Sequence, residues 1–294
     1  MTTFTSSTGC TPVPLDEDTV ARIALASAGV AGEVPVAIAI NAVGGAAAFV
    51  GAVHDGRDRV LPLSNLTRQR IRALATGDRV ARILEATREQ GLTVLTPHHA
   101  LWPQQLDSMG RGAPLVLWAR GDLTALNGFS IVITGTSSPT GYGIAMTREL
   151  SHGLGRLGYA IGAGSGSGID RVALEQTLVT GGRAFAVSAA GIEQTHAPDH
   201  VTVVSEVPPT LQVSPRSQKR AKPLLAALAA KTVIVEAGTL SPALRTAEAA
   251  HAMDRMVGVV PGLASAATSA GCHDLIQRLG VKLVTSAQEV DWMR

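Results

Sequence analysis

The 294-residue sequence has few aromatic and few charged residues, and its overall charge points to no class of partner. Phenylalanine, tryptophan and tyrosine together make up 3% of the chain, and charged residues make up 16%. The formal net charge is only +2. A role in binding nucleic acid would therefore need a local cluster of basic residues, because the whole chain does not carry the charge for it.

Cysteine and long apolar runs are also scarce. The two cysteines, Cys10 and Cys272, lie far apart, which argues against a disulfide framework and fits a cytoplasmic location. Residues 1–14 lack the basic start and apolar run of a signal peptide, and we expect them to form a disordered tail. The longest apolar stretch, residues 34–53, is interrupted by proline, asparagine and glycine, so no membrane partner is expected.

Several catalytic and metal-binding patterns are absent. There is no G-x-x-x-x-G-K-[ST] loop and no G-x-S-x-G elbow, which argues against a Walker-type nucleotidase and a serine hydrolase. His196 and His200 are four residues apart, but Pro198 between them disfavours the helix that would align them on a metal. We therefore expect no metal and no cofactor.

Residues 15–91 have a helical pattern, in which acidic residues at 16–18 precede an apolar series, as suits the positive end of a helix dipole. We expect a small all-helical domain here. Its later helices carry six arginines, which form either a solvated face or a face that contacts DNA: Arg68, Arg70, Arg72, Arg79, Arg82 and Arg88.

Residues 92–294 alternate short β-branched runs with helical stretches. Strands are predicted at 93–95, 115–119, 130–135, 159–162, 184–187, 201–205, 232–235, 257–260 and 282–284, and helices at 141–158, 168–179, 217–229, 243–253 and 272–279. This alternation predicts an α/β fold with a Rossmann-like, doubly wound, mostly parallel sheet covered on both faces. Trp102 and Trp118 are expected to pack the junction with the helical domain.

Two glycine-rich turns follow neighbouring predicted strands and precede helices. Amides at a helix start have no partner within the helix and favour an anion, so both turns are candidate phosphate sites at one crevice. Each turn alone is equally well explained as a tight turn, and neither follows G-x-G-x-x-G cleanly. The candidate binding residues are Gly135, Thr136, Ser137, Ser138, Tyr142 and Gly143 in the first turn, and Gly164, Ser165, Gly166, Ser167 and Gly168 in the second.

Basic residues could supply the positive groove that a single strand requires. Four lie within seven positions, just before a predicted helix, and form either this groove or a solvated loop: Arg216, Lys219, Arg220 and Lys222. Arg171 could reach a phosphate held at the second turn. Tyr142 either stacks on a base or packs against the sheet, and Asp170 is either a pocket residue or a helix-start acid stabilised by the dipole.

Taken together, the motifs resemble those of the DNA-processing protein A (DprA/Smf) family over roughly residues 93–290. The matching blocks include LTPHHALWPQQL at 95–106, PLVLWARG at 114–121, both glycine turns, GIEQTHAPDH at 191–200, SEVP at 205–208 and the segment from 233 to 237 that ends in Glu236-Ala237. Pro261-Gly262 fits the family's "PG", and Glu236 accompanies the family's pocket. The helical segment is similar to the family's small helical (SAM/HhH-like) domain.

The resemblance implies a protein that binds single-stranded DNA without catalysis and helps to load a RecA-type recombinase. Such proteins act in DNA recombination and natural transformation, generally as homodimers. This chain departs from the pattern, because Ser137 replaces the family's arginine and Ala221-Lys222-Pro223 replaces its basic "RNR". The usual "SGsL" is Ser241-Pro242-Ala243-Leu244, and no winged helix is expected after Arg294.

Two alternatives share the same fold. The first is a nucleotide hydrolase or phosphoribohydrolase of the LOG type, in which Glu236 would take part in catalysis. The loss of the arginine at position 137 favours it, and the absence of "PGG.GT..E" after Val260 disfavours it. The second is a nucleotide-sensing module without turnover.

Overall fold

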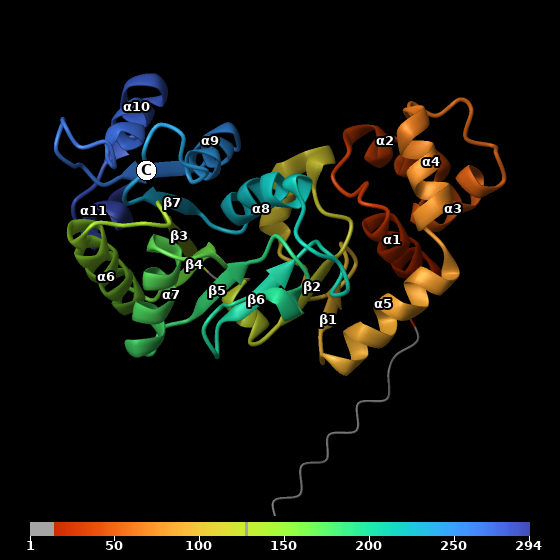
Figure 1. The fold of residues 1–294 in the computed structure, drawn as a ribbon, viewed down its shortest axis with the longest axis horizontal. Helices are drawn as coiled ribbons and strands as arrows, with labels where there is room; N and C mark the ends of the chain where they lie inside the picture. The colour runs from red at the N-terminus through yellow and green to blue at the C-terminus, as the bar shows by residue number, and fades with distance from the viewer. Residues whose placement is uncertain (1–14, 127–128) are drawn as a thin grey trace, which may run out of the picture.

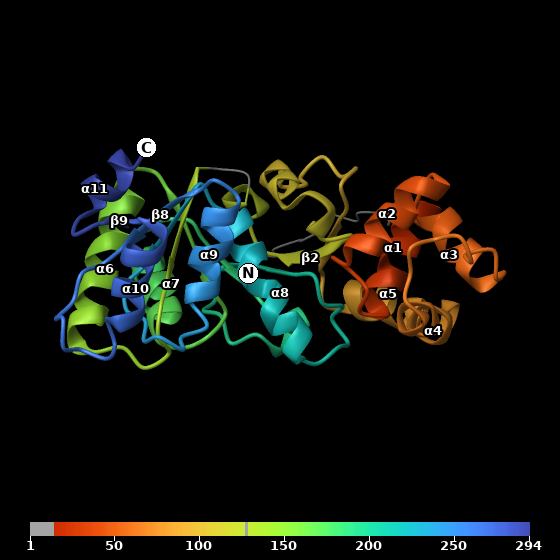
Figure 2. The same ribbon diagram turned by 90° about the horizontal axis from the view of Figure 1, so that it is seen from above.

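The computed structural model describes residues 15–126 and 129–294, so the predicted tail at 1–14 lies outside the described residues. The N-terminal part is helical, as predicted, and forms one end of the molecule in Figures 1 and 2. Side-chain caps start two of its helices: Asp16 accepts from Thr19 N at 2.6 Å, and Ser64 accepts from Thr67 N at 3.0 Å. The helices are α1 (Glu17–Ser27), α2 (Val34–Val43), α3 (Ala46–His54), α4 (Asn65–Leu74) and α5 (Gly77–Glu89).

The arginines of α4 hold this helical part together. Asp58 is fully buried and accepts from Arg68 Nε at 2.7 Å and from Arg72 at 3.0 Å. Arg70 pairs with Glu33 at 3.1 Å, which ties α4 to the loop before α2. The arginines of α4 therefore form neither a solvated face nor a face that contacts DNA, because their three guanidinium groups bind carboxylates within the helical part.

Among the described residues, the rest of the chain builds one sheet of nine strands, in the order β1-β2-β6-β5-β4-β3-β7-β8-β9. Strands β3 to β9 run parallel to one another, whereas β1 and β2 add an antiparallel edge beside β6. The strands are β1 (Thr93–Leu95), β2 (Leu117–Arg120), β3 (Ser130–Thr134), β4 (Ala160–Gly164), β5 (Ala184–Val187), β6 (Thr202–Ser205), β7 (Lys231–Ile234), β8 (Met256–Val259) and β9 (Lys282–Leu283).

Helices cover both faces of the sheet, which confirms the predicted fold class. Alternating side chains of β3 point to opposite layers: Val132 packs with α8, and Ile131 and Ile133 pack with α6 and α7. The short helix α11 was not predicted. The helices are α6 (Gly141–Arg156), α7 (Ile169–Val179), α8 (Pro215–Ala227), α9 (Leu244–Ala252), α10 (Ala270–Leu279) and α11 (Ala287–Trp292), with 3-10 segments η1 (Gln104–Gly112), η2 (Leu123–Ala125) and η3 (Ile192–Gln194).

One hydrophobic cluster joins the N-terminal helices to the edge of the sheet. Trp118 on β2 is fully buried in this cluster, and its Nε1 donates to Thr87 Oγ1 on α5 at 3.1 Å. Trp118 therefore packs the junction, as predicted. The same expectation was wrong for Trp102, which is buried in the separate cluster beneath α8.

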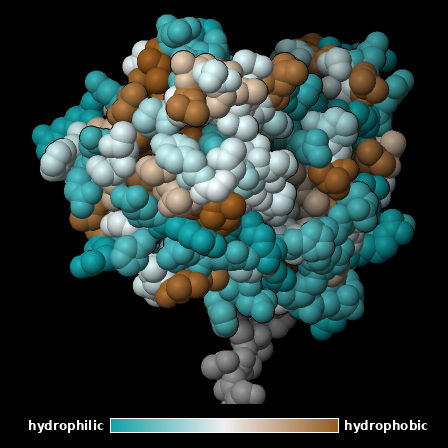
Figure 3. Space-filling view, turned by 60° about the vertical axis from the view of Figure 1, so that its left-hand side comes forward, coloured by the Kyte–Doolittle hydropathy of each residue, from teal (hydrophilic) through white to brown (hydrophobic). Residues whose placement is uncertain are grey.

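The surface shows scattered apolar residues rather than one broad patch on the side that carries α6, α10 and α11 (Figure 3). Among the described residues, no single helix is long and apolar enough to cross a membrane. Helices α2 and α3 meet that test only as a pair, and they are bent by 98° at the break between them.

Replacing Asp58 with alanine should destabilise the protein by about 3 kcal/mol, because the two guanidinium groups at this buried site would lose their shared carboxylate. Chemical unfolding followed by circular dichroism measures the change. Asp55→Ala is the matched control, since the Asp55–Arg57 pair is exposed on both sides and should contribute less than about 1 kcal/mol. Equal effects of the two substitutions would contradict a structural role for Asp58.

Candidate functional site

The order of the strands creates a crevice where the chain changes direction. From β3 the chain builds outward through β4 and β5 to β6, and α8 then carries it back to β7 on the other side of β3. Ligands of such sheets bind beyond the carboxyl ends of the strands at this switch point. A cleft of about 900 Å³ lies there, and it is lined by residues of both glycine turns, of α8 and of the segment from Gly238 to Arg245.

The first glycine turn is held by Glu236, which follows β7 and is 2% exposed. Its carboxylate accepts from Thr140 N at 2.9 Å and from Thr140 Oγ1 at 2.5 Å, and its carbonyl accepts from Thr136 N at 2.7 Å. Thr140 Oγ1 in turn accepts from Gly143 N at 3.2 Å. The carboxylate therefore places a negative charge at the start of α6, where the helix dipole favours an anion.

The second glycine turn packs directly on the first. Ile169 N donates to Thr136 O at 3.1 Å. At Gly168, which has φ +73°, a Cβ would lie 2.3 Å from Thr136 O and 2.5 Å from Ser137 Cα, so only glycine fits there. Among the described residues, the amides of Gly166, Ser167 and Gly168 have no hydrogen-bond acceptor. The start of α7 thus offers three consecutive free amides to an anion, whereas at the start of α6 the Gly143 amide is already bound by the Thr140 hydroxyl.

Asp170 lies at the floor of the cleft and is 7% exposed. Its Oδ1 has no hydrogen-bond partner among the described residues. Burial raises the pKa of this carboxyl, against the opposing attraction of the Lys222 ammonium. Its burial in the cleft lining and its unbound oxygen support the interpretation of Asp170 as a pocket residue over that of a helix-start acid stabilised only by the dipole.

The four basic residues of the 216–222 cluster separate onto two sides of α8, and they lie within its first turns rather than before it. Lys219 and Lys222 line the cleft. Arg216 and Arg220 face the N-terminal helices, where Arg216 pairs with Glu33 at 3.1 Å. The members of each pair are three or four residues apart and are therefore neighbours on the helix, and it is the folded chain that separates one pair from the other. The cluster therefore supplies two cations to the cleft, not four.

Two other predicted residues lie outside the cleft. Arg171 pairs with Glu175 on its own helix at 2.7 Å and donates to His196 O at 3.2 Å. Tyr142 donates its hydroxyl to Pro261 O at 2.8 Å, in a neighbouring pocket of about 520 Å³ whose lining includes Glu236, Pro261 and Gly262. Burial raises the pKa of Tyr142, and the negative charge of Glu236 adds to the shift.

The far wall of the cleft carries a further basic residue. Arg245 on α9 lines it and is exposed, so it adds a third cation beside Lys219 and Lys222. The Ser241-Pro242-Ala243 segment also lines this wall, where Ser241 N closes a turn by donating to Gly238 O at 3.0 Å. The segment thus forms a turn even though Pro242 stands where the motif has glycine. Only tertiary structure could place Arg245 there.

Replacing Gly168 with alanine should cost about 2 kcal/mol or more, because the new Cβ would overlap the first turn and would stand at a strongly disfavoured φ. Thermal unfolding measures the loss. Gly166→Ala is the control, because its Cβ would meet only Asp170 Oδ2, at an ordinary 3.8 Å. If both variants kept wild-type stability, the packing of one turn on the other would be contradicted.

The Asp170→Asn variant should be more stable than the wild type at pH 7, with a gain that disappears in acid. The pKa of Asp170 is higher in the folded state than in the unfolded state, so the wild type loses stability as the pH rises from the unfolded-state pKa to the folded-state pKa. Asparagine does not ionise and avoids this loss. Unfolding in urea at pH 4 to 8 measures the difference between the two proteins. A gain that grew toward acid would have the wrong sign.

Comparison with known proteins places the chain among relatives with this architecture. A sequence model of the family described as DNA recombination-mediator protein A matches residues 93–291. The putative DNA processing protein DprA of Mycobacterium tuberculosis is 32% identical over 235 residues, which cover 72% of this chain and 60% of the relative. The Bacillus subtilis DNA processing protein DprA is 30% identical over 246 residues, which cover 78% of this chain and 82% of the relative.

Two solved structures show the shared fold. The DNA processing protein A of Streptococcus pneumoniae superposes with a TM-score of 0.74 and 22% identity, over 96% of this chain and 99% of that one. The Helicobacter pylori protein reaches a TM-score of 0.60 and 20% identity, over 67% of this chain and 93% of that one. This chain thus spans about 60% of the mycobacterial relative's length and nearly all of the pneumococcal structure. Because the family model matches more than half of the chain and the relatives reach 32% identity, this chain belongs to the DNA recombination-mediator protein A family.

Proposed function

We propose that this protein binds single-stranded DNA in the switch-point cleft and acts as a recombination mediator without catalysis. The observation that carries the proposal is the meeting of free amides at the start of α7 with three cations, Lys219, Lys222 and Arg245. The family description names a recombination mediator, and the Helicobacter pylori relative has a reported single-stranded DNA binding mode. Both support the assignment of DNA as the ligand.

The chemistry of the cleft favours the sugar-phosphate backbone over the bases. One phosphate would accept hydrogen bonds from the amides of Gly166, Ser167 and Gly168, and the neighbouring phosphates would pair with Lys219, Lys222 and Arg245. Ser137 and Ser165 line the same wall and can donate through their hydroxyl groups. Recognition of this kind does not depend on sequence.

The cleft lining among the described residues contains no aromatic side chain on which a base could stack. Tyr142 faces the neighbouring pocket and is bound to Pro261. Binding should therefore depend on charge more than in proteins that hold single strands by stacking, and it should weaken steeply with salt.

The enzyme alternative depends on Glu236 as an acid, a base or a nucleophile. Both oxygens of that carboxylate accept hydrogen bonds from Thr140, and the side chain is almost completely buried. These contacts support a structural role, because a catalytic carboxylate must reach the reacting atoms. The absence of catalysis stays a prediction, which release of base from nucleoside monophosphates would contradict.

The remaining parts of the proposal rest on family membership. We include a RecA-type recombinase as partner, a homodimeric state, a cytoplasmic location and a role in natural transformation or recombination. The division into a helical domain at 15–91 and a Rossmann-like domain at 92–294 also stays a prediction, since one hydrophobic cluster is continuous between the two parts.

The Lys219→Ala/Lys222→Ala double variant should bind a fluorescent single strand of about 30 nucleotides at least tenfold more weakly than the wild type at low salt. The negative slope of log affinity against log salt should become shallower by about 1.4, because two phosphate contacts that contribute about 0.7 each are lost. Fluorescence anisotropy at several salt concentrations measures both quantities, with duplex DNA for comparison.

The charge-matched control is Arg148→Ala/Lys282→Ala, which removes two exposed cations on α6 and β9 outside the cleft. It should leave the salt slope within the error of the wild type. Equal losses in the two double variants would show that only net charge matters and would contradict the cleft as the binding site. Failure of the wild-type protein to bind at low salt would overturn the proposed function itself.

A further inference from the structure

Helix α8 connects the cleft to the N-terminal helices through two arginines on its far side. Arg220 donates to both carboxylate oxygens of Glu206, at 2.6 and 2.7 Å, and to Gly112 O at 3.1 Å from each terminal nitrogen. Its side chain is only 15% exposed and that of Glu206 only 8%. Burial lowers the pKa of Arg220, but the pairing with Glu206 outweighs this effect and raises it. A bidentate, buried pair of this kind fixes direction as well as distance.

The N-terminal helices close this joint from the other side. A Cβ on Gly32 would lie 1.9 Å from Arg220 Cζ, so the guanidinium packs directly on the Gly32 backbone. Arg216, one turn earlier on α8, pairs with Glu33 at 3.1 Å and donates to Ala31 O at 3.3 Å. Glu33 is the carboxylate that also binds Arg70 of α4. The loop before α2 therefore holds α8 at two successive turns.

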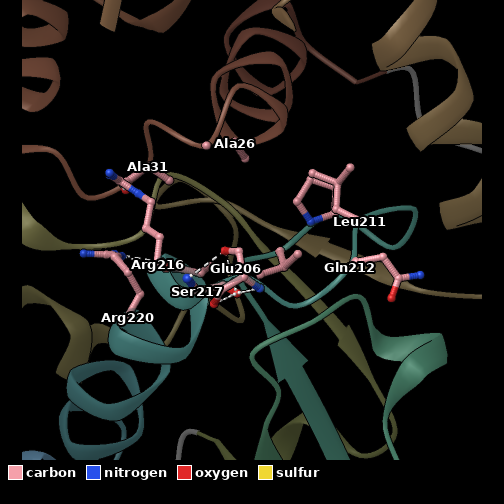
Figure 4. A pocket seen from close by; sticks show the side chains of 12 residues that line it. Ala26, Ala31, Glu206, Leu211, Gln212, Arg216, Ser217 and Arg220 are labelled. Carbon is pink, nitrogen blue, oxygen red and sulfur yellow. Dashed lines mark hydrogen bonds and ion pairs between the residues drawn. The ribbon is translucent and has the colours of Figure 1, made fainter. Parts of the chain in front are cut away.

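A small pocket of about 220 Å³ lies at the joint (Figure 4), where Arg216 and Arg220 come from α8, Ala26 comes from α1 and Ala31 comes from the loop before α2. The space beside the arginines is not filled by side chains. A change in the N-terminal part could therefore alter the arginine positions without compressing a close-packed core.

We propose that the N-terminal helices set the affinity of the cleft for DNA by fixing α8, with Arg216 and Arg220 as positioning residues that do not touch DNA. Lys219 and Lys222 stand on the same turns of α8 as these arginines, so a shift or rotation of the helix moves the cations relative to the free amides of the second glycine turn. This inference rests on the proposed function, because the readout is DNA binding in the cleft.

The geometry separates this role from direct contact by the arginines. If Arg216 and Arg220 gripped DNA, their charges would need to face the strand, yet each is paired with a carboxylate on the side away from the cleft. Freeing Arg220 by removal of the Glu206 charge would strengthen a direct contact. The same change would weaken binding if Arg220 acts by holding α8, because the bidentate pair would be lost.

The first test is Gly32→Ala, which changes no charge and lies on the N-terminal helical part. We expect its affinity for the single strand to fall about tenfold, with a smaller salt slope, because the displaced Arg220 no longer holds the lysines in place. Gly56→Ala is the matched control: Gly56 has φ +73° against +69° for Gly32, and a Cβ there would meet nothing within 4 Å. Both variants carry similar backbone strain, so unfolding curves show whether each is folded under the binding conditions.

The second test is Glu206→Gln, which keeps the side-chain size and removes one negative charge. Weaker binding than the wild type would support positioning, since electrostatics alone predicts tighter binding. Tighter binding by Glu206→Gln would overturn the inference, and so would equal affinities of folded Gly32→Ala and Gly56→Ala. In either case the proposed function would still stand, provided that the wild type binds the single strand. If the wild type itself did not bind, the proposed function would fail first.

Discussion

The buried carboxylate of Glu236 fixes the shape of the cleft. By binding both the amide and the hydroxyl of Thr140, it anchors the first glycine turn, which follows β3, to the end of β7. Strands β3 and β7 are neighbours only because α8 returns the chain across the sheet. The first turn then provides the surface on which Gly168 and Ile169 rest. The free amides of the second turn depend on this sequence of contacts, because without a fixed first turn the start of α7 would have nothing to pack against.

This arrangement also explains why the second glycine turn is more available to an anionic ligand than the first. A helix start attracts negative charge, and at α6 the protein supplies that charge from its own Glu236. At α7 the nearest carboxylate, Asp170, lies at the cleft floor, and burial raises its pKa, which disfavours its charged form. The amides before α7 are therefore left to an external anion, and the local charge does not oppose it as strongly as an ordinary aspartate would.

Much of the fold could be predicted from the sequence, because the periodicity that builds it is local. The β-branched run before Gly135 and the apolar spacing of α6 indicate a strand and a helix without further information. The side that each residue of the 216–222 cluster faces could not be predicted in the same way. Arg216 and Lys219 are three positions apart and equally basic, yet Arg216 pairs with Glu33 and Lys219 lines the cleft, a difference that only the folded chain shows. Arg245 could not be placed in the cleft from the sequence for the same reason, since α9 meets α8 only in the folded chain.

Ser137 stands where the sequence resemblance implies an arginine, and this difference changes which residues supply the positive charge of the site. A guanidinium in the first turn would bring a fixed charge on a rigid loop, whereas here the cations stand on α8 and α9 and depend on how those helices are held. Lysines on the first turns of α8 move with the helix axis, so the contacts that set this axis become part of the binding site. Those contacts reach Gly32 and Glu33, in the helical part of the chain. In this protein the helical part is therefore expected to matter for binding even though no residue of α1 to α5 lines the cleft among the described residues.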